Sequence, residues 1–92
     1  MNNKSVINAF ICGKSAKSSN GNLWSNGEKL YSYYTAIGQR LADGTIILNR
    51  TKYSVSTSKI QTWLLYSVIE SGLQYKEVCN VPLGGYRLER YL

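Results

Sequence analysis

The stretch Leu23-Trp24-Ser25-Asn26-Gly27-Glu28-Lys29-Leu30-Tyr31-Ser32 contains the strongest hairpin signal of the chain, the pair Asn26-Gly27. Both residues accept the positive φ that a type I′ turn requires, and such a turn joins two antiparallel strands. We therefore expect a short strand over residues 22–25 and a longer one from residue 28 to about residue 40. The longer segment is rich in Tyr and Thr, which are favoured in strands.

A third strand is expected after a second turn at Ala42-Asp43-Gly44. Over residues 45–53, alternation places Ile46 and Leu48 on one face of the strand and Ile47 on the other. The apolar residues lie near the turn, whereas residues 50–53 are mostly polar. The pattern therefore predicts a half-buried strand whose far end leaves the core.

The main helix is predicted over residues 58–71, with Gly72 as the residue that follows its C-terminus. Residues 54–58 offer several Ser and Thr N-caps. Apolar side chains recur at helical spacing and form one face with Ser67, so the helix is expected to pack on the sheet with Trp63 in the core. This face consists of Ile60, Trp63, Leu64, Ser67 and Val68.

The two ends of the chain carry weaker signals. A short helix is expected after an N-cap at Ser5, closed by Gly13, and residues 14–21 read as an exposed, mobile loop. Residues 73–79 alternate and favour a short final strand, whereas Asn80-Val81-Pro82-Leu83-Gly84-Gly85 is typical of a loop.

These elements predict an α+β fold: a small antiparallel β-sheet of about three to four strands packed against one main α-helix, with a short N-terminal helix. A chain of 92 residues is expected to form a single domain, residues 1–92. Such a domain retains about 3–5 kcal/mol of stability and has little room for a deep substrate pocket. We expect a monomer or a weak dimer.

The composition favours binding over catalysis. The chain has 11 Lys+Arg against 5 Asp+Glu, a net charge of +6 and no histidine, so it attracts polyanions and acidic protein surfaces. No paired carboxylates suited to acid–base chemistry and no metal-ligand spacing are visible. We therefore expect no enzymatic activity, no cofactor, no metal and no small-molecule substrate.

The two cysteines are predicted to be reduced thiols. Cys12 ends the apolar run that starts at Val6, which favours a buried free thiol. A disulfide with Cys79 would need an oxidising compartment, which no other feature indicates. The sequence has neither a signal-peptide pattern nor an apolar run long enough to span a membrane, so a cytosolic protein is expected.

Tyrosines and cations interleave between residues 23 and 63, where the only acids are Glu28 and Asp43. This pattern suits a surface that contacts phosphates, bases or acidic protein grooves. Our predicted partner contacts are the cations Lys29, Arg40, Arg50, Lys52 and Lys59 and the aromatic residues Tyr31, Tyr33 and Tyr53. Lys14 and Lys17 are predicted to be secondary contacts.

Two resemblances bear on function. The segments Asn22-Leu23, Gly27, Leu30-Tyr31-Ser32-Tyr33 and Tyr53-Ser54-Val55-Ser56-Thr57-Ser58 are similar to a motif in small phage and bacterial proteins of unassigned function. From Met1-Asn2-Asn3-Lys4-Ser5 onward, the whole chain also resembles phage-encoded anti-CRISPR proteins of the type I-F class. That class shares no common motif.

The second resemblance implies a stoichiometric inhibitor in the cytoplasm of the infected bacterial host. Its partners would be Cas proteins of the crRNA-guided type I-F surveillance (Csy) complex, and it would block recognition of target DNA. A basic chain would contact either the guide crRNA or acidic protein faces beside it. The basic charge of this chain argues against simple DNA mimicry. Two alternatives remain open: a phage regulator that binds DNA or RNA directly, and a virion or assembly component that self-associates.

Overall fold

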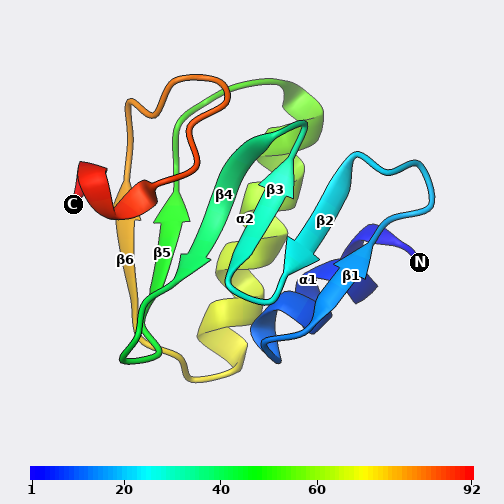
Figure 1. Ribbon diagram of the computed structural model, residues 1–92, viewed down its shortest axis with the longest axis horizontal. Coiled ribbons are helices and arrows are strands. Elements are labelled where there is room, and N and C mark those ends of the chain that lie inside the picture. The colour runs from blue at the N-terminus through cyan, green and yellow to red at the C-terminus, as the bar shows by residue number, and fades with distance from the viewer.

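The computed structural model describes all of residues 1–92 and has the predicted α+β architecture (Figure 1). It contains two α-helices and one open six-stranded mixed sheet, in the order β1-β2-β3-β4-β5-β6. The predicted three to four strands were therefore too few, and the sheet is mixed rather than wholly antiparallel because only β6 pairs in parallel. The strands are β1 (Ser15–Lys17), β2 (Leu23–Asn26), β3 (Lys29–Ser32), β4 (Thr35–Arg40), β5 (Ile46–Asn49) and β6 (Tyr75–Val78).

The predicted hairpin at Asn26-Gly27 is present, but its turn is of a different kind. The residues between β2 and β3 are Gly27 and Glu28, and only Gly27 has a positive φ, of 91°. That pattern fits a type II′ turn rather than the predicted type I′ turn. Asn26 instead uses its side chain, whose Oδ1 accepts hydrogen bonds from the backbone N–H groups of Glu28 and Lys29.

The segment predicted as one long strand over residues 28–40 forms two strands. A tight turn at Tyr33-Tyr34 separates β3 from β4, and Ser32 pairs with Thr35 across it. Both tyrosines have positive φ, 50° and 70°, which is the type I′ pattern. Sequence patterning missed the turn because it contains neither Asn nor Gly.

Two further strands enlarge the sheet. Part of the predicted loop over residues 14–21 forms β1, which pairs antiparallel with β2, and Ser18 next to it is buried. Sequence patterning missed this strand because its residues are small and polar. The strand forms because the edge of β2 supplies backbone hydrogen-bond partners. The predicted final strand is confirmed as β6, but it pairs parallel with β5 because the helix α2 lies between them in the chain.

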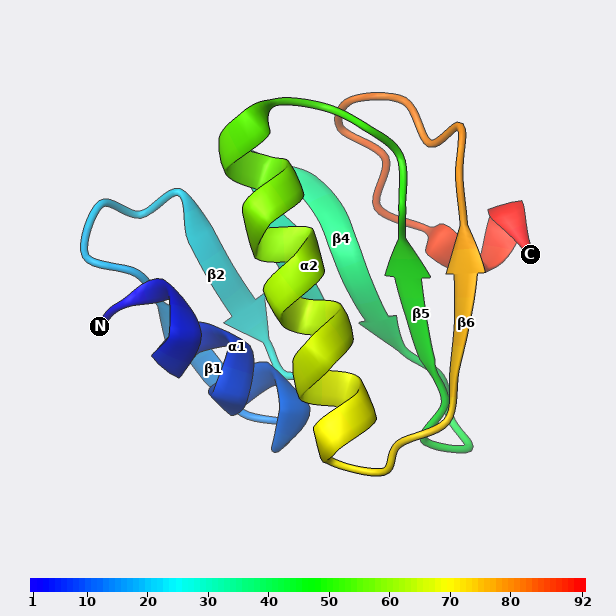
Figure 2. The same cartoon turned by 180° about the vertical axis from the view of Figure 1, so that it is seen from behind.

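Both helices lie on one face of the sheet (Figure 2). Helix α1 (Asn3–Ile11) is capped by Asn2, not by Ser5, since the Ser5 N–H donates to Asn2 Oδ1 at 2.8 Å. Helix α2 (Val55–Glu70) begins after the N-cap Ser54, earlier than predicted, and Gly72 follows its end with φ 69° as expected.

The helix-facing core is the larger of two apolar clusters. Trp63 is half-buried and packs against this cluster rather than lying inside it. The buried members from α2 are Ile60, Leu64 and Val68, and those from the rest of the chain are Val6, Ile7, Phe10, Leu23, Leu30, Ile37, Ile46 and Leu48.

The opposite face of the sheet is covered only in part. The C-terminal tail, including the 3₁₀ helix η1 (Leu88–Tyr91), lies over the β4–β6 half, where it closes a second cluster. This cluster contains Ala36, Ile47, Val78, Val81 and Leu88. The strands β1 and β2 have no such cover. On β3, Tyr31 packs against the second cluster and Lys29 bonds to Tyr86, so the open half of this face begins at β3.

The cysteines are unpaired as predicted, but the burial expected for Cys12 is absent. Cys12 is exposed rather than buried because it is the C-cap of α1 and lies beyond the last core-facing turn. Cys79 is also exposed, and both are free thiols. Neither helix has the length and apolar character needed to cross a bilayer.

Candidate functional site

Two of the predicted contact residues make hydrogen bonds that hold the fold together. The Arg40 guanidinium Nη2 donates to the backbone oxygens of Phe10 at 2.6 Å and Ile11 at 3.0 Å. It thereby binds the C-terminal carbonyls of α1, which carry the negative end of the helix dipole. The Tyr53 hydroxyl donates to the Val81 oxygen at 2.6 Å and accepts from Asn49 Nδ2 at 2.9 Å, so it ties the tail to β5.

We expect Arg40→Gln to lower the free energy of unfolding by about 2 kcal/mol, because two hydrogen bonds to a charged donor are lost. Urea denaturation followed by circular dichroism measures this change. Arg50→Gln is the matched control, since Arg50 is exposed and should change stability little. Unchanged stability of Arg40→Gln together with lost partner binding would restore Arg40 as a contact residue.

Three other predicted cations gather around the first half of α2. Lys52 precedes the helix and lines a groove of about 800 Å³, which we call the tip groove. The groove lies between the β3–β4 turn, the start of α2 and the tail, and its walls include Tyr33, Ser56, Thr57, Pro82 and Leu83. Arg50 and Lys52 line a shallow depression beside it. Lys59 lines a further hollow that also contains Tyr33.

The tip groove has a mixed surface. Leu83 is 78% exposed and offers an uncovered apolar contact, whereas hydroxyl groups and the Lys52 ammonium supply polar contacts. No acidic side chain lines this groove. Exposed apolar, hydroxyl and cationic groups in one concave surface suit a protein or nucleoprotein partner with negative charge.

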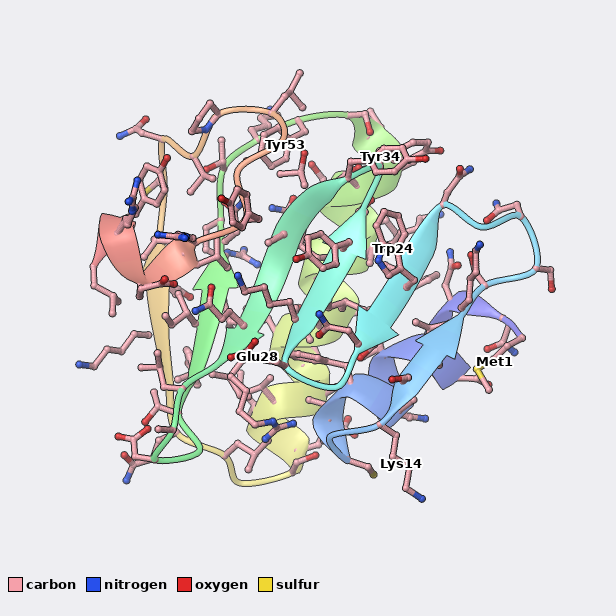
Figure 3. The ribbon with its side chains drawn as sticks, in the orientation of Figure 1. Met1, Lys14, Trp24, Glu28, Tyr34 and Tyr53 are labelled. Atoms are coloured by element: carbon pink, nitrogen blue, oxygen red, sulfur yellow. The ribbon has the colours of Figure 1, made fainter.

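The turn between β3 and β4 joins this groove to the open half of the sheet. Tyr33 is 53% exposed and faces the α2 side, where its hydroxyl accepts a hydrogen bond from Asn22 Nδ2 at 3.3 Å. Tyr34 is 77% exposed and meets the Trp24 ring edge-on, with centroids 5.2 Å apart (Figure 3). The side chains of the two neighbouring tyrosines thus lie on opposite sides of the sheet.

The open half of the sheet carries a row of aromatic side chains. We call this uncovered surface of β1 to β3 the open sheet face. Strand register aligns Lys17 on β1 with Trp24 on β2 and Tyr31 on β3. The Trp24 and Tyr31 rings stack with centroids 5.1 Å apart and an interplanar angle of 16°. The pKa of Tyr31 is raised, mainly by partial burial and to a smaller extent by the nearby Glu28 and Tyr86. The hydroxyl group therefore stays neutral at physiological pH.

Lys29 lies at the border between the open sheet face and the tail. Its ammonium donates to the Tyr86 backbone oxygen and sits 5.1 Å from the centroid of the Tyr86 ring. The pKa of the nearby Glu89 carboxyl group is lowered, mainly by a hydrogen bond from Gln39 and to a smaller extent by the charges of Lys29 and Arg87. Glu89 is therefore an anion. The Lys29 ammonium therefore already has partners within the protein. Lys14 and Lys17 are both exposed.

The predicted contact set is thus divided among different parts of the molecule. Arg50, Lys52, Lys59, Tyr33 and Tyr53 lie around the start of α2. Tyr31, Lys29 and Lys17 lie on or beside the open sheet face. Lys14 is exposed just before β1, and Arg40 binds the end of α1. Sequence reasoning missed Trp24 and Tyr34. Alternation along β2 places Trp24 opposite the buried Leu23, and that signal was available. Tyr34 belongs to the tyrosine and cation pattern of residues 23–63 but was not among the predicted contacts.

These surfaces present cationic, hydroxyl and aromatic side chains. No group of three or more His, Cys, Asp or Glu side chains is arranged to hold a metal ion. Comparison with protein families, curated proteins and solved structures finds no match to this chain.

Proposed function

We propose that this protein is a stoichiometric inhibitor that binds the crRNA-guided type I-F surveillance complex and blocks its recognition of target DNA. The inhibitor would act in the cytoplasm of the infected bacterial host. Its docking surface is the tip groove together with Arg50 and Lys59. The whole-chain resemblance to type I-F anti-CRISPR proteins suggests this partner, and the structure supplies a surface suited to it.

The observation that carries the proposal is the Tyr33-Tyr34 turn. Left-handed backbone in a non-glycine residue costs about 1–3 kcal/mol and persists where surrounding structure enforces it, often at functional positions. Asn-Gly would satisfy the same turn without this strain. Two largely exposed tyrosines at such a costly position are therefore better explained by recognition than by stability, and tyrosine is enriched among residues that dominate binding energy.

Charge supports the same surface. Arg50, Lys52 and Lys59 are all exposed. Clustered cations increase the rate of encounter with a polyanionic assembly and orient the approach. A complex built around a guide RNA presents phosphates and their neighbouring protein surfaces, so these cations suit the proposed partner.

The charge-reversed variant Arg50→Glu/Lys52→Glu tests the docking surface. We expect affinity for the reconstituted, crRNA-loaded surveillance complex to fall about tenfold or more, because attraction becomes repulsion. Both side chains are exposed, so thermal unfolding should change little. Co-elution with the complex and a mobility-shift assay of target-DNA binding measure the effect.

Lys76→Glu is the matched control, since Lys76 is exposed on β6 at the far edge of the sheet. It should inhibit like the wild-type protein. Full inhibition by the double variant would remove the tip groove from the interface. No association of the wild-type protein with the complex, together with a salt-sensitive shift of free DNA, would replace the proposal with a phage regulator that binds nucleic acid directly.

A further inference from the structure

The open sheet face contains a hollow outside the tip groove, and the two surfaces meet only at the β3–β4 turn. It has a volume of about 380 Å³ and lies beside Trp24, between the edge strand β1 and the β3–β4 turn. Lys17, Ser15, Gly21 and Tyr34 contribute to its walls. Figure 3 shows Trp24 and Tyr34 together on this face, away from the helices.

The walls of this hollow are chemically distinctive. Trp24 stacks on Tyr31, which lies on the next strand away from the hollow, so the two rings form the start of a stacked column. Tyr34 meets the Trp24 ring edge-on at the hollow. A flat aromatic group entering beside Trp24 would extend the column, and nucleobases are the flat aromatic groups that proteins bind in this way.

Charge around the column favours a base that carries phosphate. Lys17 is exposed in the wall of the hollow. Arg87 lies on the tail side, with its guanidinium 5.6 Å from the Tyr86 ring centroid. The acids of this face are Glu28, in the turn between β2 and β3, and Glu89, which is bonded to Gln39. Neither carboxylate lines the hollow.

We propose that the open sheet face binds single-stranded RNA, with one base stacked beside Trp24 and Lys17 neutralising an adjacent phosphate. A duplex does not fit this arrangement, because its bases are already stacked on one another and their faces are not available. The choice of RNA over single-stranded DNA rests on the proposed function, in which the unpaired strand available to the inhibitor is a guide RNA.

The test measures binding of a short fluorescein-labelled oligouridine to the free protein by fluorescence anisotropy, with the matching oligodeoxyuridine and an RNA duplex in parallel. We expect Trp24→Leu to weaken RNA binding about tenfold to a hundredfold, as for the loss of one stacked base. Lys17→Glu should weaken binding and reduce the slope of log affinity against log salt by about 0.7, the contribution of one phosphate.

A second readout does not depend on a variant that removes Trp24. In Trp63→Phe, Trp24 is the only remaining tryptophan, since the chain has two. Bound RNA should quench its fluorescence by stacking. Circular dichroism of each variant establishes that it is folded, and Lys52→Glu, in the tip groove, is the matched control that should bind free RNA with a smaller loss than Lys17→Glu.

The outcomes separate this inference from the proposed function. RNA binding that quenches Trp24 and weakens with Lys17→Glu supports the RNA site, whether or not the surveillance complex is bound. Absence of RNA binding, or binding without quenching, overturns the RNA site even if the complex is inhibited. Tighter binding of the DNA strand or of the duplex overturns the assignment to single-stranded RNA.

Discussion

Gly38→Val is expected to remove most of the stability of the domain, although valine is favoured in strands. A Cβ at Gly38 would lie 2.9 Å from Leu64 Cδ2 and 3.2 Å from Phe10 Cε2, so β4 approaches both helices closely at this position. Overpacking of this kind costs typically 1–3 kcal/mol, and the branched side chain is expected to reach about 3 kcal/mol. A domain of this size has about 3–5 kcal/mol in total.

Urea denaturation of Gly38→Ala and Gly38→Val measures this effect, and the loss of stability should increase with the size of the new side chain. The pair Gly38→Ala and Leu64→Ala gives an internal control. Because the new methyl group occupies space that Leu64 vacates, the double variant should be more stable than the sum of the two single changes predicts. Additive losses would contradict the proposed close contact between β4 and α2.

Tyr33→Asn/Tyr34→Gly is expected to raise stability while reducing inhibition. Replacing two left-handed tyrosines with the preferred type I′ pair relieves about 1–2 kcal/mol per residue. The loss of the Tyr34–Trp24 contact and of the hydrogen bond from Asn22 to the Tyr33 hydroxyl together offsets about 1–3 kcal/mol of this gain. A net gain of about 1 kcal/mol raises the melting temperature by about 4–8 °C in a domain of this size.

The same variant should bind the surveillance complex about tenfold or more weakly, because the exposed rings at the tip of the hairpin are lost. Thermal unfolding and the target-DNA mobility shift measure the two effects on one protein. Tyr66→Gln is the matched control, since Tyr66 is 58% exposed on α2, outside the tip groove. Undiminished inhibition by the hairpin variant would mean that the tyrosines do not contact the partner.

The sequence by itself determined the features that depend on neighbouring residues. The apolar spacing of Ile60, Leu64 and Val68 specifies the inward face of α2, and Gly72 marks its end because a left-handed residue there suits glycine. Gly27 marks the first hairpin for the same reason. The net charge of +6 follows from composition alone. The helix face, the helix end and the hairpin each depend on interactions within a few residues. The net charge is the sum of the charged side chains.

Only the tertiary structure decided which cations are free and where the open sheet face lies. Arg40 and Arg50 are equivalent in sequence terms, but Arg40 reaches the carbonyls of Phe10 and Ile11, about 30 residues earlier in the chain. Likewise, β1 forms because the free edge of β2 supplies backbone partners. Trp24 stays uncovered because the tail lies over only the other half of that face. The partners of a backbone edge or a guanidinium are set by the folded chain, and no local pattern records them.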